Sequence, residues 1–241
     1  MRVLSLCPVA TELVCSLGAA HLLVGRTDDC LYPDAARTVP SIGKAVEATI
    51  ESIAVFEPDI VFVGPERGLV APEGAKWSVV RVDPETLDDV YSLIAAVGAV
   101  LEKRIEADII LHELRAELSK LHDACTRFHA TRVYCERSGG LRVPTYVREI
   151  IAIAGGDAYS GGADIEPLAA FDPQMIIALV SCDDERYAEI VMSRHGWSAL
   201  KAIKTERLFV IQDALFRPTP RLIDGARLAA KLLHGVSVNG A

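Results

Sequence analysis

The first half of the chain alternates short apolar runs with segments of helical periodicity. Arg2–Leu6 has the pattern of a strand buried on both faces of a parallel sheet, and the apolar positions that follow share one face of a helix that begins at Pro8 and stops at Gly18. Further elements are expected in the order strand, helix, strand, strand at Leu22–Val24, Thr49–Phe56, Ile60–Val63 and Val79–Val82. Alternation of this kind predicts an α/β fold.

The second half repeats this order of elements. Arg132–Cys135 predicts a strand, Pro144 opens a helix at the position where its missing N–H costs nothing, and Gly155 with Gly156 ends that helix. Then follow the helix Glu166–Phe171, the strands Met175–Val180 and Leu208–Ile211, and the closing amphipathic helix Pro220–His234. Each half is therefore expected to form a small α/β sandwich.

One segment of sequence occurs twice. Residues 50–61 read IESIAVFEPDIV, and about 115 positions later residues 165–176 read IEPLAAFDPQMI, with Ile, Glu, Ala, Phe and Pro in register. This spacing is too long for a solenoid repeat and indicates two similar halves. Two lobes with a cleft between them are the arrangement that it favours.

The segment between the halves, residues 87–128, has helical periodicity and contains no proline. Its apolar positions include Val90, Leu93, Ile94, Val97, Leu101, Ile105, Leu111, Leu114, Leu118 and Leu121. At about 1.5 Å per residue, one helix of this length would span the whole molecule, and Gly98 is where it could break or kink. We therefore expect two similar α/β lobes, residues 1–86 and 129–241, joined by one long rigid α-helix, with a ligand cleft between the lobes.

Charge and hydropathy limit the partners. The formal net charge of −8 and the absence of any Lys/Arg run argue against nucleic acid. No stretch reaches the roughly 18 uninterrupted apolar residues that span a bilayer, so no membrane insertion is expected. Glu12 interrupts the apolar N-terminal stretch, which favours folded structure over a signal peptide. As written, the chain is expected to be a soluble, unexported monomer.

The six cysteines form no CxxC pair and have no histidine at zinc-ligand spacing. They are Cys7, Cys15, Cys30, Cys125, Cys135 and Cys182. We expect most of them to be buried as small apolar residues, in a number that fits a reducing compartment better than an oxidising one. The chain also lacks the GxSxG, GxxxxGK(S/T) and HExxH motifs, so no catalytic site and no protein-bound metal are expected.

Candidate binding residues follow the predicted strands, because open α/β sheets bind ligands at the carboxyl ends of their strands. In the first half these loops hold Cys7 with Pro8, and then Asp28–Tyr32. In the second half they are Glu136–Arg142, Cys182–Asp183 and Leu215–Pro218. The alternative for each residue is an ordinary turn residue that packs on the surface.

Four motifs, in this order, resemble one family. They are RVLSLCPVATELVCSLG near the start, DDCLYP at 28–33, VPTYVREIIAIAGG at 143–156 and FRPTPRLIDG at 216–225. They resemble the cobalamin-binding subgroup of the helical-backbone, or class III, periplasmic binding proteins, and the resemblance covers nearly the whole chain. That class serves ABC importers of corrinoids, siderophores and haem, and its fold is two α/β lobes joined by a long helix.

The resemblance implies a corrinoid, cobalamin or cobinamide, as the ligand. A corrin ring is a wide apolar disc edged with amides, so it needs flat apolar contacts and a few hydrogen-bonding groups. The expected ligand contacts are Cys7, Pro8, Asp29, Cys30, Tyr32, Arg137, Arg142, Tyr146, Cys182, Phe216 and Arg217. Leu141 and Arg142 stand where the subgroup often has a His–Trp pair, so a ligand other than complete cobalamin stays open. A thiolate from Cys7, Cys30, Cys135 or Cys182 would suit cobalt, against the commoner outcome of burial.

The resemblance also implies ABC transporter permease subunits as partners. In the family, a glutamate on each lobe docks onto arginines of these subunits, and Glu51 and Glu166 hold this place in the two copies of the repeat. The alternative is a carboxylate that simply favours the start of a helix.

Two other functions stay open from the sequence. One is a cytosolic corrinoid-salvage or sensing protein, or an enzyme, on the same fold; the other is a binding protein for a ferric siderophore or haem. The family role implies an extracytoplasmic location, in the periplasm or at the cell surface. A cytoplasmic location is expected instead if the chain as written is complete, since it shows no signal peptide.

Overall fold

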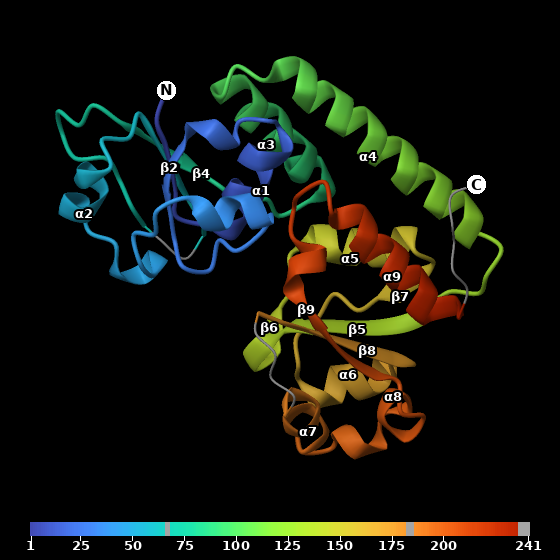
Figure 1. Cartoon of the computed structure of the whole chain (residues 1–241). Helices are drawn as coiled ribbons and strands as arrows, with labels where there is room; N and C mark the ends of the chain where they lie inside the picture. The colour runs from blue at the N-terminus through green and yellow to red at the C-terminus, as the bar shows by residue number, and fades with distance from the viewer. Residues whose placement is uncertain (66–67, 182–185, 236–241) are drawn as a thin grey trace. The chain divides into compact units, whose positions relative to one another are not determined.

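A computed structural model describes residues 1–65, 68–181 and 186–235. The chain divides into two compact units (Figure 1). The first unit comprises Met1–Pro84, Asp88–His112 and Pro218–Pro220, and the second comprises Glu85–Leu87, Glu113–Arg217 and Arg221–Ala241. Each unit contains its own sheet, parallel in the first unit and mainly parallel in the second.

The sheet of the first unit has the strand order β2-β1-β3-β4, with every pairing parallel. Its strands are β1 (Val3–Ser5), β2 (Leu23–Arg26), β3 (Ile60–Val63) and β4 (Ser78–Arg81). Its helices are α1 (Pro8–Ser16), α2 (Ile50–Val55) and α3 (Leu87–Val100). Figure 1 shows α2 on one side of the sheet and α1 and α3 on the other.

Both faces of the first sheet are buried, as its apolar runs predict. Leu4, Val61 and Val63 point to the α2 side, where Ile53 of α2 is fully buried and Trp77 packs against the same cluster. Because neighbouring residues of a strand point to opposite faces, Val3 and Phe62 face the α1 side, and both are fully buried.

The sheet of the second unit has the order β6-β5-β8-β9, with β7 also paired to β5. Its strands are β5 (Thr131–Arg137), β6 (Leu141–Arg142), β7 (Gly156–Ala158), β8 (Met175–Val180) and β9 (Leu208–Gln212). Only the β5–β6 pairing of this sheet is antiparallel within the described ranges.

Five helices accompany this sheet in the described part of the second unit. They are α5 (Thr145–Ile153), α6 (Ile165–Phe171), α7 (Tyr187–Met192), α8 (Lys201–Lys204) and α9 (Leu222–His234). Figure 1 shows α5 and α9 on one side of the sheet and α6, α7 and α8 on the other. The α6 side holds a core that includes Tyr134, Leu168 and Trp197.

Short 3-10 segments occur in both units. They are Ala20–Leu22, Asp34–Thr38, Ala45–Glu47, Ser138–Gly140, Trp197–Ala199 and Asp213–Phe216.

The two sheets share one topology, which confirms the prediction of two similar halves. Strand β1 lies between β2 and β3 in the first unit, and β5 lies between β7 and β8 in the second. The repeated segment forms a helix and then a strand in both units, α2 with β3 and α6 with β8. Ile53 and Leu168, which occupy the same place in the repeat, are both fully buried.

The segment expected as one helix over 87–128 is divided into two helices. Helix α3 ends at Val100, and α4 (Arg104–Cys125) is the long helix, with 22 residues. Between them Glu102 has a left-handed backbone (φ 59°), and the Lys103 N–H donates to the Gly98 carbonyl over 2.7 Å. A Cβ at Gly98 would collide with the Ala107 side chain, so the glycine permits the close approach of α3 and α4. The division of the chain at residues 86 and 128 stays a prediction.

None of the helices in the described ranges combines the length and the apolar character needed to cross a membrane.

Candidate functional site

The loop after β1 places Cys7 and Pro8 at the start of α1. Cys7 is the N-cap residue with an extended backbone, and Pro8 follows in the first turn, where no backbone donor is needed. The Ser5 hydroxyl donates to the Cys7 carbonyl over 2.9 Å, and the Thr11 hydroxyl donates to Ser5 Oγ over 2.8 Å. The Cys7 side chain is buried, so this corner would contact a ligand mainly through its backbone and Pro8.

The loop after β2 contains one exposed aromatic residue and one engaged carboxylate. Tyr32 is 48 % exposed, and Asp29 is exposed while its carboxylate accepts a hydrogen bond from the Thr27 hydroxyl. Cys30 is fully buried, with its Sγ 3.1 Å from Thr27 Oγ1. Tyr32 is therefore the residue of this loop that presents a flat surface to solvent.

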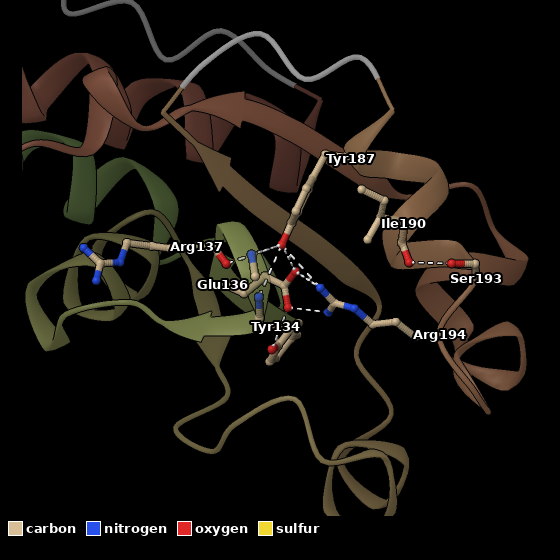
Figure 2. A network of polar contacts seen from close by, with 9 residues as sticks. Tyr134, Glu136, Arg137, Tyr187, Ile190, Ser193 and Arg194 are labelled. Atoms are coloured by element: carbon tan, nitrogen blue, oxygen red, sulfur yellow. Dashed lines mark hydrogen bonds and ion pairs between the residues drawn. The ribbon is translucent and has the colours of Figure 1, made fainter. Parts of the chain in front are cut away.

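At the carboxyl end of β5 the chain turns back as a short hairpin into β6. Glu136 lies opposite Arg142, and Arg137 lies opposite Leu141. Paired residues point to the same face of an antiparallel ladder, so the two arginines lie on opposite faces. Both arginines are exposed, and neither has an ion-pair partner among the residues that the structure describes. Figure 2 shows Arg137 pointing away from the residues that surround Glu136.

Glu136 is the centre of a buried polar network (Figure 2). Its carboxylate is 0 % exposed and accepts two bonds from the Arg194 guanidinium, Nη1 to Oε2 over 2.6 Å and Nη2 to Oε1 over 2.8 Å. The Tyr187 hydroxyl donates to Oε1 and the Tyr134 hydroxyl donates to Oε2, each over 2.9 Å. A buried carboxylate needs such partners because an uncompensated charge in the interior is costly.

The network connects the core of the second unit to the loop Ser138–Gly140. The Tyr187 oxygen accepts the Gly139 N–H over 2.9 Å and the Gly140 N–H over 3.4 Å. The Arg194 guanidinium also lies over the Trp197 ring, 4.5 Å from its centroid. The same few side chains thus hold the carboxylate and the backbone of the loop.

The environment favours the protonated form of the three partners of Glu136. Burial and then the charge of Glu136 raise the pKa of Tyr134, and burial and then the hydrogen bond to Glu136 raise the pKa of Tyr187. Burial alone would lower the pKa of Arg194, but the hydrogen bond and charge of Glu136 raise it above its ordinary value. Both hydroxyls therefore stay donors and the guanidinium stays charged at neutral pH.

The aromatic candidates of the second unit are buried. Phe216 is 2 % exposed and lies against α9 beside Gly225, and Tyr146 is buried with its backbone N–H donating to the Glu85 carbonyl over 2.8 Å. Burial raises the pKa of Tyr146. Neither ring presents an exposed face in this structure, because the apolar character that suggested stacking is used in packing. Their contact with a ligand stays a prediction, as does that of Arg217, whose guanidinium pairs with Asp213 over 3.2 Å.

Burial is the outcome for most of the cysteines that the structure describes. Cys7, Cys30, Cys125 and Cys135 are buried, and Cys15 is partly exposed. Burial raises the pKa of Cys30 and of Cys135, so these groups are thiols rather than thiolates at neutral pH. Cys182 lies outside the described residues. Within the described ranges, no three His, Cys, Asp or Glu side chains gather as metal ligands.

Glu51 and Glu166 occupy matching places on α2 and α6. Each is exposed and lies in the first turn of its helix. Thr49 and Ser52 form a capping box at the start of α2, and backbone and Thr49 hydrogen bonds lower the pKa of Glu51. The docking role of the two carboxylates stays a prediction.

Tyr134, Tyr187 and Arg194 were missed among the functional candidates. The sequence signal that could have led to them is Glu136, which directly follows the apolar residues 133–135. A glutamate at the end of a buried strand is expected to require a buried partner. The partner itself, Arg194, lies 58 positions away and has no local sequence signature.

No family model matches the chain. Among curated proteins, it is 23 % identical to YvrC, an uncharacterized ABC transporter substrate-binding lipoprotein of Bacillus subtilis, over 97 % of this chain and 80 % of that protein. It is also 23 % identical to a vitamin B12-binding protein of Vibrio cholerae, over 92 % of this chain and 85 % of that protein.

Solved structures show the same fold. A periplasmic binding protein of Veillonella parvula matches with a TM-score of 0.84 at 18 % identity, over 98 % of this chain and 92 % of that chain. A periplasmic haem-binding protein of Pseudomonas aeruginosa gives 0.79 at 22 % identity, over 100 % and 95 %. The vitamin B12-binding protein BtuF of Vibrio cholerae gives 0.71 at 22 % identity, over 96 % and 95 %.

The protein thus has the fold of the helical-backbone, or class III, periplasmic binding proteins. Its sequence resembles the substrate-binding proteins of ABC transporters and, among them, the vitamin B12-binding proteins, which confirms the resemblance seen in its motifs.

Proposed function

We propose that this protein captures a corrinoid, cobalamin or cobinamide, and delivers it to the permease of an ABC importer. The observation that carries the proposal is the alignment with a vitamin B12-binding protein over 92 % of this chain and 85 % of that relative. A substrate-binding role in an ABC transporter is supported by YvrC as well. The protein would act outside the cytoplasm, and it would bind its ligand without making or breaking a bond.

The exposed residues of the candidate loops fit such a ligand. Tyr32 offers an aromatic face to the apolar ring, while Arg137 and Arg142 offer donors to the amide oxygens at its edge. Asp29 offers an acceptor to the amide N–H groups. Cys7 and Phe216 are buried and would shape their own loops rather than offer an exposed contact.

The test is calorimetry of the purified protein with cobalamin, cobinamide, haem and a ferric hydroxamate siderophore. We expect micromolar or tighter binding of at least one corrinoid, a binding free energy of about −8 kcal/mol or better. Arg137→Met and Arg142→Met should each weaken it, and Arg115→Met, a cation on α4 outside these loops, should not. The corrinoid assignment would be refuted if calorimetry detected no binding of either corrinoid but did detect binding of another ligand.

Haem is the second candidate, and one observation favours it. Arg137 and Arg142 have no ion-pair partner among the described residues, and guanidinium groups are well suited to the carboxylates that haem carries at its edge. The structural likeness to a haem-binding protein agrees with this but concerns the fold alone. Binding of haem in preference to both corrinoids, lost in the double variant of the two arginines, would establish this candidate.

A further inference from the structure

We propose that Tyr187 and Arg194 are positioning residues of the ligand site: through Glu136 they fix the loop Ser138–Gly140 and thereby the exposed side chains of Arg137 and Arg142. The structural half of this proposal is that the network fixes the loop, and it concerns the ligand-free protein. The ligand-binding half is that the fixed loop favours ligand binding, and it rests on the proposed function.

The loop needs outside support because its own conformation is unusual. Gly139 and Gly140 both have left-handed backbones, with φ of 81° and 75°. Glycine adopts this conformation readily, but it also has more freedom to leave it than any other residue. Both N–H groups donate to one oxygen, that of Tyr187, which fixes the loop at the point where it is most free.

The Tyr187 hydroxyl is itself held in place. It donates to Glu136 Oε1, and Arg194 Nη2 lies 3.3 Å from the same hydroxyl oxygen. Figure 2 shows the Tyr187 hydroxyl beside the Glu136 carboxylate, with the Arg194 guanidinium close to both. Because Glu136 is fully buried, a change in any of its partners is expected to affect the whole network.

Arg194 also lies near the loop. A Cβ built at Gly140 would lie 3.8 Å from Arg194 Nη2 and 3.6 Å from the Ala163 side chain, so these two side chains face this part of the loop. The flat guanidinium is in turn stacked on Trp197, which is buried in the core of the second unit. The position of the loop is thus set by the core rather than by solvent-exposed contacts.

The residues that the loop carries are the exposed ones. Arg137 immediately precedes Ser138, and Leu141 and Arg142 immediately follow Gly140. All three are exposed, and they stand at the carboxyl end of β5, where this class of sheet receives ligands. Fixing the loop before the ligand arrives removes an ordering cost from binding.

The first test uses the ligand-free protein and Tyr187→Phe, which keeps the ring and removes the hydroxyl. Amide exchange at Leu141 and Arg142, which are not bonded to Tyr187, should become about fivefold faster, as the loss of one or two hydrogen bonds predicts. The matched control is Tyr159→Phe, on a ring in contact with the same core whose hydroxyl is not bonded to the loop. Unchanged exchange in Tyr187→Phe would overturn the proposal.

The second test uses a ligand that the parent protein binds in calorimetry. Tyr187→Phe should weaken its binding about fivefold or more, mainly through faster dissociation, and Arg194→Met should weaken it further. Arg194→Lys should not restore affinity, since an ammonium lacks the paired donors and the flat face. A merely structural role would lower the melting temperature and leave affinity unchanged, which would overturn the ligand-binding half.

Failure of the proposed function gives a different result. If the parent protein binds neither corrinoid but binds haem or the siderophore, the affinity comparison is made with that ligand. If it binds none of the four probes, the proposed function and the ligand-binding half fail together, while the exchange experiment still decides whether the network fixes the loop.

Discussion

Cys135 illustrates how burial at a single residue makes stability depend on pH. Burial raises the pKa of its thiol above the ordinary value of 9.0. The folded protein therefore keeps a proton that the unfolded chain loses, so this contribution to stability is complete below about pH 9 and is lost as the pH rises further. Tyr134 and Tyr146 act in the same direction above the ordinary tyrosine value of 10.0.

We predict that Cys135→Ala reduces the alkaline loss of stability. Between about pH 9 and pH 10, the parent protein should lose about 1 kcal/mol of unfolding free energy more than the variant does. Urea unfolding under reducing conditions measures the difference. Val133→Ala, two positions earlier on β5, is the control and should shift stability equally at both pH values. Equal slopes in the parent and Cys135→Ala would contradict the prediction.

At the scale of single residues, the sequence predicted types of environment better than roles. The expectation that most cysteines are buried holds for Cys7, Cys30, Cys125 and Cys135. The sequence also identified the loops at the strand ends as candidate binding loops. It could not assign roles to their aromatic residues, because a ring that packs and a ring that contacts a ligand have the same local pattern. Tyr32 and Phe216 were treated alike, and the structure exposes the first and buries the second.

Helix α9 depends on one glycine at its contact with the Asp213–Phe216 segment. A Cβ at Gly225 would collide with the Leu215 carbonyl oxygen, a backbone atom that cannot move alone. We predict that Gly225→Ala destabilises the protein by about 1–3 kcal/mol, despite the better helix propensity of alanine. Chemical unfolding measures it. Gly162→Ala is the control, because a Cβ there meets nothing within 4 Å and the backbone is not left-handed. A gain of stability in Gly225→Ala would show that α9 can shift.

At the scale of elements, regular patterns gave accurate bounds and tertiary contacts caused the misses. The buried strands β3 and β8 have the predicted ends, since their apolar runs are bounded by turn residues. Gly98 was named as the place where the helix could break, but the end of α3 could not be fixed, because apolar spacing continues through Leu101 and Ile105. The divided helices pack closely where Gly98 meets Ala107, a tertiary contact that a local pattern does not contain.

The whole molecule carries two exposed acidic residues at matching places in its two halves, Glu51 and Glu166. We predict that Glu51→Arg combined with Glu166→Arg abolishes binding to the importer while leaving ligand affinity and melting temperature nearly unchanged. The reason is that two equivalent carboxylates suit a two-fold permease with a pair of arginine sites. Uptake assays and co-purification with the permease measure the effect.

The control pair is Asp108→Arg with Glu189→Arg, which makes the same change of charge at exposed positions of α4 and α7. It should leave transport intact. If the Glu51 and Glu166 double variant still supports uptake, the docking role is wrong. If no permease partner is found and the variant only melts earlier, a salvage or sensing role gains support.

Each unit contains one of the two tryptophans, Trp77 in the first and Trp197 in the second. Trp77 packs against the α2 side of one core, and Trp197 lies beneath Arg194 in the other. Corrinoids and haem also absorb in the near-ultraviolet range where indoles emit, so a bound molecule would quench the fluorescence of nearby indoles by energy transfer. Replacing one tryptophan at a time by phenylalanine would leave a single emitter in a known unit. The protein therefore carries a built-in optical probe for each of its halves, with which ligand arrival can be followed without a label.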